Sequence, residues 1–249
     1  MFCFRFVLSL NKIGCGIGNA QINLAFLSPC TIFVKDCKIW LIEGIDGMLK
    51  YQIPTWMQMC YRGVTWRKKT DRKVIHLTFD DGCVPEVTPQ VLTILKDKGV
   101  KATFFCVGDN VRKHPELFER IKTEGHQVGN HTQNHLKGAE TSLQMYLDNI
   151  EQAHKHIKSQ FFRPPYGRMT REQKLAVSKN YKIVLWDVLT NDFDAKVSVE
   201  ELIRQTLRHT RNGSIVVFHD SLKAAPRMLP ALPVLIDQWK AQGYRFDVL

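Results

Sequence analysis

From about residue 73 onward, short apolar runs alternate along the chain with longer segments of helical periodicity. Most of the apolar runs are rich in Val, Ile and Phe and are bounded by turn-forming residues, a pattern typical of buried strands. Seven runs are predicted to be strands, at 73–79, 101–107, 125–130, 160–164, 181–188, 213–219 and 244–249. Six helices are predicted between them, at 85–99, 114–125, 141–159, 170–180, 198–210 and 232–243.

This alternation predicts a parallel sheet wrapped by helices. Several predicted helices begin after Thr, Ser or Pro and end at Gly or Asn, as helix capping requires. The number of strands fits an open doubly wound sheet and a barrel equally well. Both architectures place functional groups at the carboxyl ends of the strands, so a site should appear there.

The first 47 residues differ from the rest of the chain. "MFCFRFVLSL" contains an arginine within a short apolar run and is followed by no clear cleavage site, so it is a poor signal peptide. No apolar run reaches the ~18 residues that a membrane-spanning helix needs. We expect 1–47 to be a loosely ordered or misassigned extension, with the native start near Met48 or Met57. Residues 48–72 form a basic and aromatic lead-in that packs on a catalytic domain at 73–249.

The formal net charge of +11 favours anionic partners. The basic residues are nevertheless scattered, with one denser cluster at 65–73, and no nucleic-acid-binding motif is present. A solvated basic surface without a nucleic-acid partner is the better interpretation. The seven cysteines fit neither a zinc ribbon nor a thiol redox pair, and we expect free thiols that fill apolar space.

Polar residues gather at the ends of five predicted strands. In chain order they are Asp80 and Asp81, His131 and His135, Arg163 and Tyr166, Asp187 and Asp192, and His219 and Asp220. One such residue is usually a helix cap or a packed side chain, but five strand ends supplying polar groups together predict a reactive site.

His131 and His135 are four residues apart, so on a helical turn both imidazoles would project from one face. With a nearby carboxylate they form a set of two histidines and one carboxylate, which leaves coordination positions open for water and substrate. The sequence therefore predicts a catalytic divalent metal, with zinc as the first choice.

Four motifs resemble those of the polysaccharide deacetylases with the NodB homology domain, also called carbohydrate esterase family four. They are "TFDDG" at 78–82, "HTQNH" at 131–135, "RPPYG" at 163–167 and "VFH" at 217–219. The resemblance, which extends over about 73–221, implies a TIM-barrel-like distorted (β/α) barrel of about seven parallel strands. It also implies a divalent metal, often zinc, and removal of N-acetyl or O-acetyl groups from a glycan such as peptidoglycan or chitin.

The resemblance assigns the metal to Asp81, His131 and His135. It makes Asp80 the general base, which takes a proton from a water on the metal, and His219 the general acid.

Further roles follow from the same resemblance. Arg163 would pair with Asp80, and the backbone N–H of Tyr166 would face the oxyanion. The substrate would contact Pro165, Tyr166, Phe193 and Val217. Because adjacent strand residues face opposite ways, both carboxylates of "TFDDG" can reach one cleft only if the chain turns, which we expect Gly82 to permit.

The chain departs from the family pattern at its fourth motif, usually D-x-x-D-W. Here "LTNDF" places Leu189 and Phe193 at the first and last positions, while Asp192 matches the second carboxylate. We hypothesise that Asp187, on the same strand face as Leu189, orients His219 instead.

Smaller departures lie near the other motifs. Cys83 stands where the family usually has proline, so we expect a looser or thiol-sensitive loop there, and Val217 replaces leucine. Asp220 either extends the His219 network or caps the loop that follows it.

Two other functions stay open. One is an amidase of the same fold that acts on a small cyclic amide, and the other is a glycan-binding protein with impaired catalysis. A phosphohydrolase is disfavoured because its Asp-x-Asp spacing is missing. We expect a monomer acting on an acetylated amino-sugar glycan. Its location is open, because family members often act at the cell envelope and the chain shows no convincing export signal.

Overall fold

The computed structural model describes residues 50–249, apart from the side chains of Trp56, Met57 and Cys60. The expectations for residues 1–47 and for a native start near Met48 therefore lie outside the described part of the chain. Among the described helices, none combines the length and apolar character needed to cross a bilayer.

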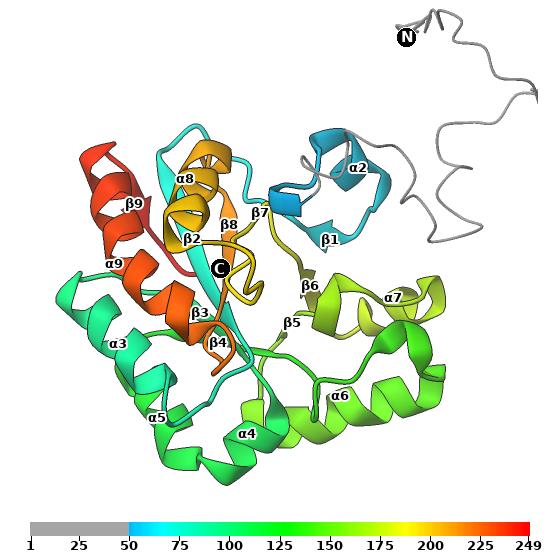
Figure 1. The fold of residues 1–249 in the computed structure, drawn as a ribbon. Coiled ribbons are helices and arrows are strands. Elements are labelled where there is room, and N and C mark those ends of the chain that lie inside the picture. The colour runs from blue at the N-terminus through cyan, green and yellow to red at the C-terminus, as the bar shows by residue number, and fades with distance from the viewer. Residues whose placement is uncertain (1–49) are drawn as a thin grey trace, which may run out of the picture. The chain divides into compact units, whose positions relative to one another are not determined.

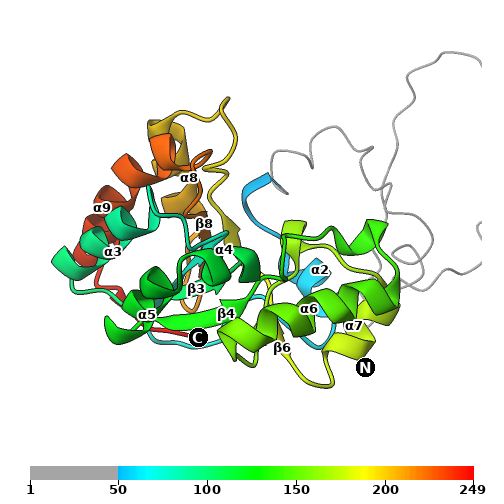
Figure 2. The same ribbon diagram turned by 90° about the horizontal axis from the view of Figure 1, so that it is seen from below.

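The described residues form a curled, parallel sheet with helices on its outer side (Figures 1 and 2). Its strands are β1 Val64–Thr65, β2 Val74–Asp80, β3 Thr103–Cys106, β4 Gln127–Asn130, β5 Phe161–Phe162, β6 Lys182–Val184, β7 Val188–Leu189, β8 Ile215–His219 and β9 Arg245–Phe246. The order is β1-β6-β5-β4-β3-β2-β8-β7, with β9 beside β2. The predicted α/β class and barrel-like parallel sheet are confirmed. The predicted strand 181–188 is divided into β6 and β7, and β1 was not predicted.

The helices cover the outside of the sheet. They are α2 Thr55–Cys60, α3 Thr88–Asp97, α4 Gly108–Lys113, α5 Pro115–Thr123, α6 Leu143–Ile157, α7 Arg171–Val177, α8 Val199–His209 and α9 Ala225–Ala241. Three of them differ from the prediction: α2 and α4 were missed, and α9 begins well before residue 232. Three prolines make the start of α9 look like a loop. Pro226 lies in the first turn, where no backbone N–H is needed, whereas Pro230 and Pro233 lie inside the helix.

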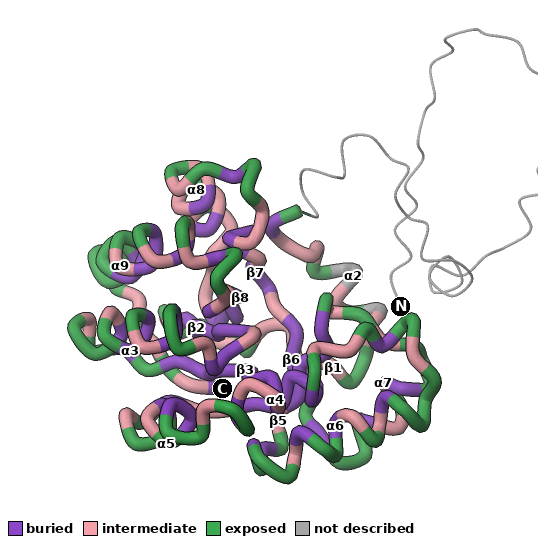
Figure 3. The backbone as a smooth tube through the Cα atoms, turned by 60° about the horizontal axis from the view of Figure 1, so that its bottom comes forward, coloured by how far each residue is buried: buried purple, intermediate pink, exposed green. Residues whose placement is uncertain are grey.

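Alternation along β2 separates the hydrophobic core from the interior of the curled sheet. Ile75, Leu77 and Phe79 are fully buried in the main apolar cluster beneath the helices. Thr78 and Asp80 lie on the opposite face of the strand, as the two-residue period requires. Figure 3 shows the buried strands enclosed by helices whose outer faces are exposed.

The lead-in before β2 contacts both edges of the sheet. β1 pairs with β6, and Arg67 forms an isolated bridge with Ser214, directly before β8. Farther back, Gln52 bridges Val188 in β7. These contacts cover strand edges that would otherwise present unpaired backbone groups to solvent.

Candidate active site

The carboxyl ends of β2, β4 and β8 bring the histidines and the paired carboxylates together. Asp81 Oδ1 lies 3.3 Å from Nε2 of His135 and 4.0 Å from Nε2 of His131. One ligand atom from each of these three residues falls within 4.8 Å of the others. Two neutral imidazole nitrogens and one carboxylate oxygen are a suitable donor set for zinc or a similar divalent ion, so the chemistry of the cluster fits the predicted metal.

The segment that holds the two histidines is an irregular loop, and the predicted helical turn is wrong. His135 has a φ of 56° and Thr132 a φ of 66°, so both residues lie in the left-handed region. The loop is supported by Asn130 Oδ1, which accepts from the Thr132 backbone N–H at 2.8 Å. The imidazoles therefore converge because the loop folds back on itself.

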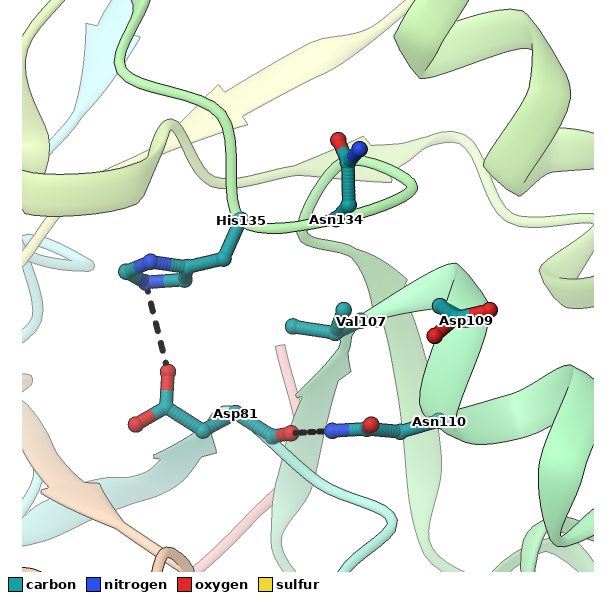
Figure 4. Close-up of a pocket in the computed structure, with 6 residues that line it drawn as sticks. All are labelled: Asp81, Val107, Asp109, Asn110, Asn134 and His135. Carbon is teal, nitrogen blue, oxygen red and sulfur yellow. Dashed lines mark hydrogen bonds and ion pairs between the residues drawn. The ribbon is translucent and has the colours of Figure 1, made fainter.

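Contacts behind the three candidate metal ligands, Asp81, His131 and His135, fix their positions. His131 Nδ1 lies 2.7 Å from the carbonyl oxygen of Arg163, which makes Nδ1 the donor and leaves Nε2 free for an ion. Burial lowers the pKa of His131 to about 4, so its imidazole is neutral at pH 7. The side-chain amide of Asn110 in α4 donates to the carbonyl oxygen of Asp81 at 2.8 Å (Figure 4). Sequence reasoning missed Asn110, although it follows the carboxyl end of β3.

The turn after β2 differs from the expected one. The left-handed residue is Asp81, with a φ of 87°, and Gly82 is needed for another reason. A Cβ at Gly82 would lie 2.5 Å from Oδ2 of Asp220. The glycine therefore provides the space in which the Asp220 carboxylate packs.

Asp220 performs neither of the two expected roles. It is fully buried, and its oxygens accept from the Gly82 N–H at 3.0 Å and from Oγ1 of Thr88 at 2.5 Å. Thr88 Oγ1 in turn accepts from the Val84 N–H at 2.9 Å. These bonds hold the loop on both sides of the buried Cys83, so the loop is well anchored without the proline that the family usually has there.

Asp80, directly before the candidate metal ligand Asp81, forms a buried ion pair. Its Oδ1 accepts from Nη1 of Arg163 at 2.6 Å, and both side chains are almost completely buried. Arg163 Nη1 also donates to Oγ1 of Thr78 at 2.8 Å, and its guanidinium lies 4.1 Å from the centre of the Phe105 ring. Burial by itself would raise the pKa of Asp80, but the charge and the hydrogen bond of Arg163 outweigh burial and lower it. The carboxylate is thus ionised and oriented.

Tyr166 lies in a tight turn after β5. The Gly167 N–H donates to the carbonyl oxygen of Pro164 at 3.0 Å, and Tyr166 has a φ of 59° and a ψ of 9°. These angles are typical of the third residue of a type II turn, with Pro165 at the favoured second position. The Tyr166 side chain is 54% exposed, and its ring contacts His135 at a centroid distance of 4.7 Å.

His219, at the end of β8, is oriented by Asp192. Its Nδ1 lies 2.7 Å from Asp192 Oδ1, and its backbone N–H donates to Asp192 Oδ2 at 2.7 Å. Burial lowers the pKa of His219, but the charge and hydrogen bond of Asp192, with the charges of Asp81 and Asp80, outweigh burial and raise it to about 9. The imidazole is therefore protonated at neutral pH, as a general acid must be.

The hypothesis that Asp187 orients His219 is wrong. Asp187 precedes β7, and its N–H donates to the carbonyl oxygen of Ile215, four residues before His219 and so about 13 Å lower along β8. Its buried carboxylate accepts from Arg211 at 2.6 and 2.9 Å and from Ser214 Oγ at 2.8 Å. A bond from Gln58 in α2 at 3.0 Å completes its surroundings. Asp187 thus joins the lead-in to the sheet.

The other residues expected to contact the substrate differ in how far they are exposed. Phe193 is half-buried and meets His219 edge-on at a centroid distance of 5.1 Å. Pro165 is buried beneath the exposed Tyr166. Val217 has no exposed surface, so it supports the floor of the site and offers no contact surface to a substrate, contrary to expectation.

Comparison with known families and proteins agrees with this arrangement. The family model for polysaccharide deacetylase matches residues 67–184. A peptidoglycan-N-acetylglucosamine deacetylase of Bacillus cereus is 36% identical over 190 residues, which cover 74% of this chain and 89% of that protein. The chain belongs to the polysaccharide deacetylase family.

Further members of the family show how far the similarity extends. The peptidoglycan-N-acetylglucosamine deacetylase PgdA of Listeria monocytogenes is 31% identical to this chain. The matched region covers 95% of this chain and 50% of PgdA. The crystal structure of the Bc1960 peptidoglycan N-acetylglucosamine deacetylase has 32% identity and a TM-score of 0.73, and covers 79% of this chain and 95% of its own. A CE4 family pseudoenzyme from Bacillus anthracis has 27% identity and a TM-score of 0.65. The match covers 73% of this chain and 65% of the pseudoenzyme.

In this polysaccharide deacetylase, replacing Asp192 by Asn should move the basic limb of the pH profile to lower pH. His219 loses its proton as the pH rises through about 9, so wild-type activity should persist up to that range. In the variant the charges of Asp80 and Asp81 still raise the pKa of His219, but the charge of Asp192 is lost. Burial, which lowers this pKa, therefore has a larger net effect, and the pKa falls. We expect kcat/KM for acetate release to decline ~1 pH unit or more earlier.

Asp194→Asn is the matched control, because that carboxylate bonds to the Lys196 N–H and to Lys50 and not to His219. Equal basic limbs for wild type and the Asp192 variant would contradict the assignment of Asp192 as the partner of His219.

Proposed function

We propose that this polysaccharide deacetylase is a metal-dependent hydrolase that removes N-acetyl groups from N-acetylglucosamine residues of a glycan, with peptidoglycan as the first candidate. The decisive observation is that the metal-binding cluster, the Asp80–Arg163 pair and the Asp192–His219 pair all occur at the carboxyl ends of the strands. The names of the relatives, peptidoglycan and chitooligosaccharide deacetylases, support the substrate class. Peptidoglycan would place the action of the protein at the cell envelope.

Asp81, His131 and His135 would hold the ion, and we propose zinc because two imidazoles and one carboxylate are a common catalytic zinc set. When bound, the ion would act as a Lewis acid and lower the pKa of a coordinated water.

The residues around this cluster would move the protons. Asp80, kept ionised by Arg163, would accept a proton from the attacking water. The backbone N–H of Tyr166 would donate to the oxygen that becomes negatively charged in the tetrahedral state. His219, protonated at neutral pH, would donate a proton to the departing amine nitrogen. General acid and base catalysis of this kind contributes about 10²–10⁴-fold to the rate of a reaction.

The same residues could also hydrolyse an O-acetyl ester or a small cyclic amide, but they favour these substrates less than an N-acetyl glycan. An amine leaves the tetrahedral intermediate only when its nitrogen is protonated, whereas an alcohol leaving group depends less on a proton donor. His219 is protonated at neutral pH because its pKa is raised, and it therefore favours the N-acetyl substrate. A glycan-binding protein without catalysis is disfavoured, because the metal cluster, the base and the acid are all present among the described residues.

The test combines metal analysis with acetate release. Purified protein should contain about one divalent ion per chain. It should release acetate from chitotetraose and peptidoglycan faster than from acetylated xylan, and should not open a cyclic amide such as allantoin. Chelation should abolish acetate release, and added zinc should restore it. His131→Ala is the control that loses the ion. Full metal occupancy without acetate release from any glycan would overturn the proposal.

A further inference from the structure

Asp192 and Phe193 are the two central residues of a tight turn between β7 and α8. The Asp194 N–H donates to the carbonyl oxygen of Asn191 at 3.0 Å and closes this turn. Both central side chains contact His219, Asp192 through its carboxylate and Phe193 through its ring. The hydrogen bond that closes a β-turn joins its first and fourth residues, so the peptide between the two central residues has no partner within the turn itself.

Arg227 in α9 supplies a partner for this central peptide. Its Nε donates to the carbonyl oxygen of Asp192, which belongs to that peptide, at 2.6 Å. Its Nη2 donates to the carbonyl oxygen of Lys223, in the loop after β8, also at 2.6 Å. Because a guanidinium is a rigid, planar group with several donors, one side chain fixes the separation of the two loops. His219 is the last residue of β8, so Arg227 joins the loops on either side of it.

The backbone of Arg227 is itself firmly held. The residue lies in the first turn of α9, where its N–H donates to the carbonyl oxygen of Ala224 at 3.0 Å. Ala224 and Met228, which follows Arg227, are both fully buried in the main apolar cluster. Side chains carried by packed helices hold their positions more precisely than side chains on loops. Arg227 can therefore act as a fixed support for the turn that contains Asp192.

The contact between Asp192 and His219 needs such a support. Asp192 is the remaining carboxylate of the fourth motif, since Leu189 occupies the position of the first. If Asp192 moved, His219 would lose the acceptor of its Nδ1–H and of its backbone N–H together. We propose that Arg227 is a positioning residue for His219, which acts by holding Asp192 and Phe193 against the imidazole. This inference rests on the proposed function, because it concerns the support of the general acid.

Removal of Arg227 distinguishes an effect of position from an effect of charge. The charged groups around His219 and Phe193 are Asp80, Asp81, Asp192, Lys223 and Arg227. If Arg227 acted through its positive charge, its loss would raise the pKa of His219 and move the basic limb of the pH profile to higher pH. If Arg227 holds Asp192 in place, its loss weakens the bond to His219, and the basic limb moves to lower pH.

The first test measures kcat, KM and the pH profile of acetate release from chitotetraose for wild type and Arg227→Met. We expect kcat to fall about three- to tenfold, the loss expected for one hydrogen bond. KM should be unchanged, because the general acid acts on the departing nitrogen and not in binding. The basic limb should move to lower pH. In an Asp192→Asn background the same substitution should move the limb much less, since the carboxylate that Arg227 positions is already gone.

Lys223→Gln is the control for charge. Its ammonium group lies 5.7 Å from the centre of the Phe193 ring, so its removal takes a positive charge from the same surroundings without breaking a bond to Asp192. This control should not move the basic limb to lower pH. Metal content and the free energy of unfolding in urea are measured for every variant, so that a loss of fold is recognised as such.

Amide hydrogen exchange tests the same support without catalysis. The His219 N–H donates to Asp192 Oδ2 at 2.7 Å, so its exchange rate reports on that bond. In the full-length, metal-loaded protein, NMR should show faster exchange of this N–H in Arg227→Met, by a factor similar to the loss of kcat, and no change in Lys223→Gln.

Either an unchanged exchange rate in Arg227→Met or a basic limb that moves to higher pH would overturn the inference. A wild-type protein that releases no acetate from any glycan would instead overturn the proposed function. Faster exchange of the His219 N–H in Arg227→Met would still support the positioning role in that case.

Discussion

Replacing Asp80 by asparagine is expected to lower kcat for acetate release by about 10²–10⁴-fold, the contribution of a positioned general base. The amide cannot accept a proton from the attacking water, and the nearby charge of Arg163 no longer has its partner. The metal-binding cluster is left intact, because its ligand atoms come from Asp81, His131 and His135.

The measurement is single-turnover acetate release with metal content determined on the same sample. Asp71→Asn is the control, since Asp71 is exposed in the lead-in to the same strand. A variant that keeps full metal occupancy and more than about a tenth of the wild-type rate would rule out Asp80 as the base.

Replacing Arg163 by methionine should have the largest effect on stability. Asp80 would remain buried without a counter-charge, and breaking a buried pair in this way costs about 3–5 kcal/mol in the free energy of unfolding. Arg163 also donates to the carbonyl oxygens of Val184 and Leu185 at 3.2 and 3.0 Å, and these bonds are lost as well.

The dependence of this loss on pH gives a sharper test. In the wild type the pKa of Asp80 is lowered, so the stability it contributes persists above its unfolded-state pKa and is lost as pH falls through the folded-state value. In the Arg163 variant burial raises that pKa instead, and protonation relieves the buried charge. The deficit relative to wild type should therefore shrink between pH 7 and pH 5.

Urea denaturation at both pH values measures the deficit. Arg168→Met serves as the control for loss of an exposed arginine in the same loop. The double variant Asp80→Asn, Arg163→Met should recover part of the loss, since no unpaired charge remains in the core. A deficit that is independent of pH and equal in the double variant would show that the pair contributes through packing and not through charge.

Local sequence patterns were sufficient for most of the strands and for much of the site. β2 and β8 are short apolar runs that end in polar residues, and parallel strands place such ends on one face. Asp80, Asp81 and His219 could therefore be placed near one another from the sequence.

The features that the sequence did not predict depend on the path of the backbone in loops, which the pattern of polar and apolar residues does not determine. The hypothesis for Asp187 rests on its sharing a strand face with Leu189, but a shared face does not imply a shared height along the strand. Asn191 has a φ of 57°, and this left-handed residue redirects the chain just before Asp192. The bonds from Asp220 to Gly82 and Thr88 join residues more than 130 positions apart, which no local pattern reveals.

The attachment of the lead-in has a consequence for domain boundaries. The family match begins at residue 67, but β1 lies before it and pairs with β6, and Gln58 donates a hydrogen bond to Asp187. A fragment cut at the family boundary would leave the β6 edge open and Asp187 with one donor fewer. Chimeras that exchange catalytic domains between members of the family should therefore be joined before residue 50, so that the lead-in and the sheet come from the same parent.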